Sequence, residues 1–502
     1  MLGAVLCGLT VPAIGQSAGD LPAAPTPSVA AYQSTLPGGI TVERATPGAL
    51  PLSIDDAIAT GLKHNLEIES GLQNERRVRG LERTVENNLL PTIQAEAYTR
   101  AQEINLAAMG FKVASLGGLL GPGAGGNFKT IVKVNTTAAQ LNLSQQIFNV
   151  PAYFLYKAAK SAVAGSSLTT LNARGNVALA VGTAYLQVIA DAAQIENERS
   201  LVKVDEVALQ QARDLQAAGV GTHLDTLRAQ VQLQSEQQTL VSAENQYAKD
   251  KIALNRRMGI AADQELTLTD AVPYAELTHA ELPELMSLAF QRRKDLLSLE
   301  SQMEVANQTQ KAVKFERLPT IAFGGFYGVL GETTGLYHGV FTAQGSVRFP
   351  IFREAEFRGE REVADAQLLG LQQQIASLRV TIEQQIRSSL LDVESANDLV
   401  KVAESNVVLS LQELDDAQQR FLAGVSDNLP VVQAEARLAG SQSQVVRTMY
   451  QYNAAKLLLA RNVGVVESQY RQYLGVDCGP LILRGLRVWG GVGYASIGYE
   501  RG

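Results

Sequence analysis

The sequence predicts a mainly helical chain that carries two pairs of membrane-type strands and consists of two copies of one unit. Three observations lead to this prediction. Landmark peptides recur in the same order in both halves, long stretches have helical spacing without proline, and alternating stretches follow a repeated Leu-Pro-Thr-Ile. Recurrence at a fixed separation is typical of chains in which each copy forms the same supersecondary unit.

The duplication is seen in four landmarks. The peptide Leu-Pro-Thr-Ile begins at Leu90 and again at Leu318, 228 residues later. The other three landmarks recur after 204 or 205 residues: Ile147-Phe148 as Ile351-Phe352, the turn around Gly219 as the turn around Gly424, and the peptide ending at Ile260 as the one ending at Val465. The first offset is longer because the first copy contains a glycine-rich insertion between its two strands.

Composition excludes several classes of function. The formal net charge of −7 argues against nucleic acid as a partner, because phosphate binding needs a basic surface. The two cysteines, Cys7 and Cys478, lie in the terminal regions, and the four histidines are scattered without ligand spacing. We therefore expect no metal site, no cofactor and no enzyme activity.

The N-terminal residues have the composition of a targeting segment. Residues 1–18 contain an apolar run followed by small residues, as in a secretory signal, although the basic residues that usually precede such a run are missing. A start site further upstream would supply them, and lipidation of Cys7 is left open. Residues 19–51 form a Pro/Ala-rich linker.

Long helices are predicted on both sides of the strands. Residues from Ser53 to Asn88 have helical spacing, with Ser53 as the cap, and Pro91 ends the helix. No proline occurs between Pro151 and Pro273, and apolar residues there repeat at coiled-coil spacing. A continuous helix from Ala152 to Ala217 would be about 100 Å long at a rise of 1.5 Å per residue. No run of 18 apolar residues occurs, so no transmembrane helix is expected.

Alternating segments predict two strands in each copy. Ile93, Ala95 and Ala97 alternate with polar residues, and a bulge near Ala139 would reconcile the two parities of the following strand. Four strands cannot close a barrel, and an open strand edge is not tolerated in lipid. A membrane role would therefore require other copies of the chain to close the edges.

These segments together resemble the TolC-like outer-membrane efflux proteins. The resemblance runs from about Leu52 to Val465 and rests on "LSIDDAIATGLKHNLEI", "LLPTIQAEA", "LNLSQQIFN" and "AAGVGTHLDTLRAQ", with the second copies "RLPTIAF", "SVRFPIF" and "LAGVSDNLPVVQAEARL". It implies a mainly α protein with membrane β structure. Each chain of a homotrimer would give four strands to a 12-stranded β-barrel, joined to a long α-helical coiled-coil barrel.

The resemblance also implies a function. The chain would be a passive exit duct of a tripartite efflux pump or type I secretion system, in contact with outer-membrane lipid and extending into the periplasm. Its partners would be a periplasmic adaptor protein and an inner-membrane pump of the RND or ABC type. Neither the cargo nor the pump class follows from the residues.

The predicted domain boundaries follow the duplication. The first repeat covers residues 52–265, residues 266–282 link the repeats, the second repeat covers 283–465, and residues 466–502 form an atypical tail of unassigned role. The strands are expected at about 91–102, 130–148, 319–329 and 339–351.

The resemblance assigns roles to two groups of residues. Adaptor docking and pore closure fall on the helical turns, at Gly219, Gly221, Thr222, Asp225, Gly424, Asp427 and Asn428. The helix-to-strand junctions fall at Pro91, Phe148, Pro319 and Phe352.

One feature of the family is missing. Well-known members carry two aspartates, six and nine residues past the glycine of the second turn, that ring the closed pore. Those positions are Pro430 and Gln433 here, and their counterparts in the first copy are Asp225 and Arg228. The gating residues are therefore not identified by sequence.

Two other interpretations fit the sequence less well. A soluble trimeric coiled-coil scaffold of the cell envelope would show neither alternating strands nor a signal-like start, and both are present. The peptide "GPGAGG" at residues 121–126 matches a nucleotide-binding pattern formally, but a strand-like segment follows it where a helix is needed. We therefore expect an extracellular loop there.

Overall fold

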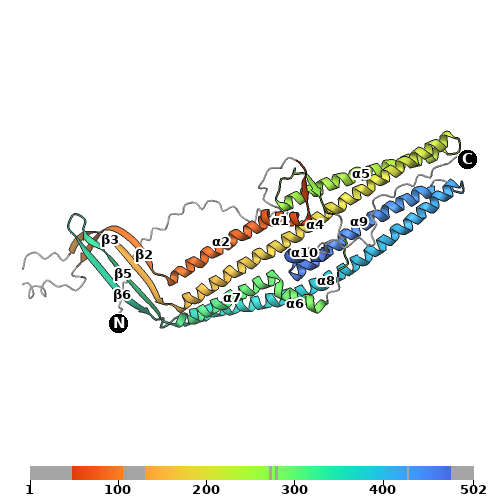
Figure 1. Cartoon of the computed structure of the whole chain (residues 1–502). Coiled ribbons are helices and arrows are strands. Elements are labelled where there is room, and N and C mark those ends of the chain that lie inside the picture. The colour runs from red at the N-terminus through yellow and green to blue at the C-terminus, as the bar shows by residue number, and fades with distance from the viewer. Residues whose placement is uncertain are drawn as a thin grey trace, which may run out of the picture.

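The structure is a computed structural model that describes residues 48–105, 108, 131–270, 274–277, 281–426 and 429–475. The molecule is elongated: a sheet lies at one end, and two long helical hairpins reach the opposite end (Figure 1). The signal-like segment, most of the Pro/Ala-rich linker, the "GPGAGG" peptide and the tail beyond residue 475 lie outside the described residues.

Both repeats contain the same series of elements. The first repeat comprises α1 (Ile54–His64), α2 (Leu66–Glu86), η2 (Asn87–Leu89), β2 (Thr92–Asn105), β3 (Ile131–Phe148), α4 (Val150–Ala217) and α5 (His223–Met258). The second repeat comprises α6 (Leu282–Arg292), α7 (Lys294–Lys314), η3 (Phe315–Arg317), β5 (Thr320–Glu332), β6 (Tyr337–Arg348), α8 (Glu354–Leu422) and α9 (Leu429–Val463). Two short strands, β1 (Leu50–Leu52) and β4 (Leu266–Leu268), and α10 (Val466–Leu474) complete the described chain.

The entry helix of the first repeat is broken, whereas the sequence predicts one continuous helix. Ser53 caps α1 as expected, with its hydroxyl oxygen accepting from the backbone N–H of Asp56. The helix stops at Asn65, whose backbone is extended, and the Asn65 side chain then accepts from the N–H of Glu67 to begin α2. A side chain that caps the backbone at this point competes with continuation of the helix.

The long helices account for the length of the molecule. Helix α4 has 68 residues and α8 has 69, so each is about 100 Å long. Each pairs with the shorter helix that returns from its tip, α5 and α9 respectively (Figure 1). Val181, Tyr185 and Val188 of α4 follow the predicted coiled-coil spacing and are fully buried.

The main hydrophobic core lies at mid-length, where the two repeats meet. Leu52 and Ile58 from the start of the first repeat pack there with Tyr185 of α4, Leu254 of α5 and Leu457 of α9. The parallel pair β1–β4 closes the end of the first repeat onto its beginning. The two repeats thus share one core instead of forming separate domains.

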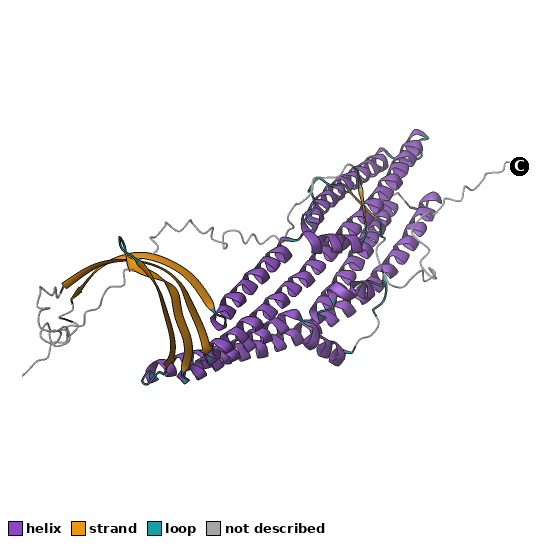
Figure 2. Ribbon diagram, turned by 60° about the vertical axis from the view of Figure 1, so that its left-hand side comes forward, coloured by secondary structure: helices purple, strands orange, loops and turns teal. Residues whose placement is uncertain are grey.

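The four long strands form one antiparallel sheet in the order β2-β3-β5-β6. The sheet curves strongly into an arc (Figure 2). Its register aligns Ala95, Leu141, Tyr327 and Phe341 across all four strands, one from each. The neighbouring row, on the opposite face, contains Glu96, Gln140, Gly328 and Val340.

The bulge predicted near Ala139 is wrong. The pairing of β2 with β3 runs without a register shift from Thr92 to Asn105, and the only irregularity among the described pairs lies between Gln146 and Phe148, where β3 meets β5. Val132 and Val134 therefore stay on the face opposite Leu141. Toward the outer part of β3, both faces of the strand therefore carry apolar side chains. The alternation of apolar and polar residues alone does not distinguish this arrangement from a bulge.

One described helix is apolar enough to cross a membrane by length and composition. The window lies in α4, and 56% of it is buried inside the protein. Burial of this kind is typical of a core helix, so the finding is weak evidence for a membrane span.

Candidate functional site

The tip between α4 and α5 is a tight, fully capped helical turn. Gly219 adopts a left-handed φ of 75°, and the N–H groups of Val220 and Gly221 both donate to the carbonyl oxygen of Leu215. The hydroxyl oxygen of Thr222 accepts from the Asp225 N–H at 3.2 Å, and the Asp225 carboxylate accepts from the Thr222 N–H at 3.2 Å. This reciprocal capping box makes the start of α5 rigid.

The tip between α8 and α9 repeats the first part of this geometry. Gly424 has a φ of 69°, its N–H donates to Phe421, and the Val425 N–H donates to Arg420. Asp427 and Asn428, which the sequence places in the site, lie outside the described residues. In Figure 1 the two tips reach the same end of the molecule.

Both tips expose apolar side chains that sequence reasoning missed. The exposed fractions are 79% for Val220, 83% for Leu422 and 71% for Val425, and Leu224 is also exposed. Singly exposed apolar residues need no explanation, but here they cluster at the end of two hairpins. The signal was present in the sequence as an apolar residue directly after each tip glycine.

The positions at which well-known members carry the two aspartates have other surroundings in this structure. Pro430 lies in the first turn of α9 and Gln433 is exposed one turn later. Asp225 is held by its capping box and lies 3.7 Å from Arg228. The charge of Asp225 is thus partly neutralised within its own helix.

The four junction residues lie at the transitions between helices and strands. Pro91 separates η2 from β2, and Pro319 separates η3 from β5. Phe148 is the last residue of β3, and Phe352 lies between β6 and α8 with 90% exposure. Proline suits the first position of a strand because it removes a donor and cannot continue the helix before it.

The two faces of the sheet differ in polarity. Tyr327 and Phe341 are exposed on one face, at 71% and 77%, in the same register row as Leu141. On the other face, the Glu96 carboxylate accepts from the amides of Gln140 and Asn142. An exposed apolar face opposite a hydrogen-bonded polar face is the pattern of a strand sheet between lipid and water.

The helical part contains a buried acidic seam between α4 and α9. We define the seam as Glu198 and Asp205 of α4 and Glu435 of α9, all at most 5% exposed. Burial raises the pKa of Glu435 to about 7, with a further contribution from Asp205. Burial, assisted by Glu236 of α5, raises the pKa of Asp205 to about 6. The Asp205 Oδ2 atom has no hydrogen-bond partner within the described part of the chain.

The seam is not a metal centre. Among the described residues, no group of three or more His, Cys, Asp or Glu side chains could hold a metal ion. Clustered carboxylates that cannot all ionise instead retain protons at higher pH. The raised pKa values of the seam predict that the contact between the two hairpins depends on pH.

Comparison with known proteins identifies the family. The family model described as "Outer membrane efflux protein" matches residues 61–260 and 285–465, which is well over half of the chain. The chain belongs to the outer membrane efflux protein family. As a member, it is an outer-membrane exit duct for efflux pumps.

Solved channels have the same fold. VceC of Vibrio cholerae aligns with a TM-score of 0.67 at 17% identity, over 82% of this chain and 96% of that chain. CmeC of Campylobacter jejuni aligns with a TM-score of 0.68 at 14% identity, over 84% and 89%. The open state of MtrE of Neisseria gonorrhoeae gives 0.68 at 17%, over 82% and 89%. The predicted helical barrel with a β domain is thus confirmed as the fold class.

Proposed function

We propose that this efflux protein acts as a homotrimer without enzymatic activity, in which three four-stranded sheets close a 12-stranded barrel. The observation that carries the proposal is the pair of free sheet edges. Within the described chain, β2 pairs only with β3, and β6 pairs only with β5. Unpaired backbone groups are very costly in hydrocarbon, so the free edge of β6 in one copy would pair with that of β2 in the next.

A disulfide scan tests the closure. In a variant with Cys7 and Cys478 replaced by Ser, one cysteine is fixed at Ala97 of β2. A second is moved along β6 through Gly339, Phe341, Ala343 and Gly345, which lie on the same face as Ala97 in the register of the sheet. Cross-linked ladders that end at three chains support the trimer. Ladders that end at two or four chains, or no cross-link at any position, contradict it.

We further propose that the tips dock a periplasmic adaptor protein, which connects the duct to an inner-membrane pump of the RND or ABC type. The exposed Val220 and Val425 support this proposal because each lies beside a tip glycine at the end of the molecule farthest from the sheet. Apolar side chains there would gain from being covered by a partner helix. Gly219, Gly221, Thr222, Asp225 and Gly424 would shape the turns that present them.

Site-specific photo-crosslinking tests the docking. A photoreactive amino acid at Val220 or Val425 should capture the adaptor in cells, and mass spectrometry of the purified adduct should reveal whether an RND or an ABC pump accompanies it. The charged variants Val220→Asp and Val425→Asp should reduce export, whereas the neutral, nearly isosteric variants to Thr should retain most of it. Adducts formed only between copies of this chain would contradict adaptor docking at the tips.

A further inference from the structure

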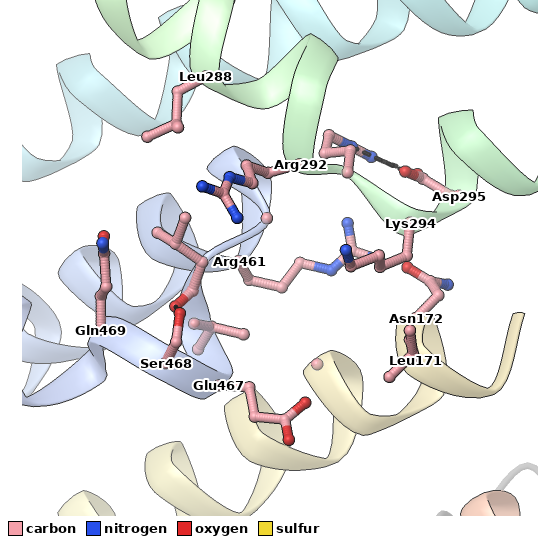
Figure 3. Close-up of a pocket in the computed structure, with 15 residues that line it drawn as sticks. Leu171, Asn172, Leu288, Arg292, Lys294, Asp295, Arg461, Glu467, Ser468 and Gln469 are labelled. Carbon is pink, nitrogen blue, oxygen red and sulfur yellow. Dashed lines mark hydrogen bonds and ion pairs between the residues drawn. The ribbon is translucent and has the colours of Figure 1, made fainter. Parts of the chain in front are cut away.

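A pocket at mid-length lies away from the tips and the sheet. Its volume is about 400 Å³, within the range of small-ligand sites. It forms where the α6–α7 junction meets the turn between α9 and α10, with α4 on the third side. Figure 3 shows Arg292, Lys294 and Arg461 on different elements around this space.

The charges that line the pocket do not balance. Arg293 is paired with Asp295 at 2.6 Å, and Arg174 donates to Glu467 at 2.9 Å, so both lining carboxylates have partners. Within the described part of the chain, Arg292, Lys294 and Arg461 form no ion pair, which leaves three cationic groups in surplus.

Arg461 is the most constrained of the three. Its guanidinium is half-buried and donates from Nε and Nη2 to the neutral Asn176 Oδ1 atom, at 3.0 and 2.8 Å. Burial and the nearby Arg293 both lower the pKa of Arg461, and the Asp295 carboxylate partly opposes them. The nearby carboxylate, Asp295, is hydrogen-bonded to Arg293, and the guanidinium of Arg461 itself donates to a neutral amide oxygen. The anionic compensation that a buried guanidinium usually has is therefore shared between two arginines.

The first repeat shows that the fold itself does not require the cations at the α6–α7 junction. By the two repeat offsets, Arg292, Arg293 and Lys294 correspond to His64, Asn65 and Leu66. The backbone arrangement is the same, because Gly259 packs against His64 as Gly464 packs against Arg292 and Arg293. In the first repeat the junction is completed by a neutral cap, the Asn65 side chain.

The second junction differs in a second way. Helix α10 begins at the pocket, and its cap residue Val465 has no side-chain hydrogen bond to offer. The N-terminal end of a helix carries a partial positive charge, which adds to that of the three cations. The second repeat therefore carries positive charge at the α6–α7 junction, where the corresponding junction of the first repeat has a neutral cap.

We propose that this pocket binds a small oxyanion, a phosphate or carboxylate group held between Arg292, Lys294 and Arg461. Arg461 and Arg292 provide planar guanidinium donors suited to two oxygens, and Lys294 provides a point charge. The site lies where α4, α6, α7, α9 and α10 meet, so an occupant would tie the end of the second repeat to its beginning.

Calorimetric titration of the full-length protein in detergent tests the proposal. Inorganic phosphate and succinate are titrated separately in low-salt buffer, to distinguish a phosphate site from a carboxylate site. The variant Arg292→His/Lys294→Leu carries the first-repeat residues, which the same junction accommodates in the first copy. We expect it to weaken binding of the preferred anion roughly tenfold or more.

The matched control is Arg256→Gln, because Arg256 is the counterpart of Arg461 in the first repeat and is exposed. It should bind the anion as the unaltered protein does, and all variants should melt at the same temperature without the anion. If the double variant does not fold, Lys294→Leu alone carries the test. The proposal fails if neither anion binds at millimolar concentration, or if a folded variant binds as tightly as the unaltered protein.

Discussion

A Cβ atom on Gly464 would lie 3.0 Å from the carbonyl carbon of Arg292, so the turn that ends α9 presses directly on the α6–α7 junction. Gly259 stands in the same relation to His64, with a distance of 2.8 Å to the His64 carbonyl oxygen. Both glycines have left-handed φ values, 85° and 78°. The same contact thus occurs in both repeats. It fixes each returning helix, α5 or α9, against the entry helices of its own repeat.

Replacing Gly464 by Ala should destabilise the protein strongly. The left-handed backbone costs a residue with a Cβ about 1–2 kcal/mol, and the contact with the Arg292 backbone adds to this because backbone atoms cannot move aside freely. Gly424→Ala is the matched control, since Gly424 has a φ of 69° but nothing within 4 Å of its Cβ position. Thermal unfolding should show a larger decrease in Tm for Gly464→Ala. Equal decreases in Tm would mean that the contact with the Arg292 backbone does not restrict a side chain at position 464.

Replacing Tyr185 by Phe should loosen the connection between the start and the end of the first repeat. The Tyr185 hydroxyl donates to the Leu52 carbonyl oxygen at 2.8 Å and contacts the Asp270 carboxylate at 2.9 Å, while the Ile54 N–H donates to the same carboxylate oxygen. We expect a loss of about 1–2 kcal/mol in the free energy of unfolding. Tyr153→Phe is the control, because Tyr153 is 46% exposed. An unchanged Tm for Tyr185→Phe would contradict a structural role for this network.

The acidic seam predicts a specific pH dependence. Because the pKa of Glu435 is raised to about 7 in the folded state, the folded form retains a proton that the unfolded form releases above about pH 4. Stability should therefore fall as pH rises from about 4 to about 7, and then level off. Glu435→Gln removes the ionised form, so it should raise the Tm at pH 8 and leave it nearly unchanged at pH 5.

The control for the seam is Asp416→Asn, since Asp416 of α8 is exposed and lies outside the seam. It should change the Tm little at either pH. For Glu435→Gln, the difference at pH 8 should be about 3 kcal/mol in the free energy of unfolding, because the pKa of Glu435 rises from 4.5 to about 7 and each pH unit corresponds to about 1.4 kcal/mol. An equal effect of Glu435→Gln at both pH values would indicate a packing change instead of a titration.

The polarity of the sheet faces predicts opposite responses of adjacent residues. Phe341→Arg places a charge on the exposed apolar face and should cost up to about 2–4 kcal/mol if the position lies near the bilayer midplane. Thr342→Arg places the same charge on the opposite face, where Thr342 pairs with Phe326. We expect Phe341→Arg to lower the amount of protein recovered in the outer-membrane fraction and Thr342→Arg to leave it nearly normal. Reversal of this order would assign the faces the other way round.

Features that depend on neighbours along the chain could be predicted from the sequence. The Ser53 cap, the run without proline after Pro151 and the alternation around Ile93 act over a few residues. The structure has the capped helix, the long helix and the strand that they predict. The family resemblance likewise rested on ordered local segments. The break at Asn65 was missed because an asparagine within helical spacing serves equally well as an ordinary helix residue or as a cap.

Contacts between distant segments cannot be read from local patterns and depend on how the chain packs. Asp205 and Glu435 meet in the acidic seam across 230 residues, and Lys294 and Arg461 share a pocket across 167 residues. A residue pattern specifies which face of a helix is apolar, but the partner of a polar position depends on how two hairpins pack. Local sequence patterns are thus enough to predict the repeated helical and strand architecture and the family. The partners of the buried charges depend on the packing of the two repeats around one core.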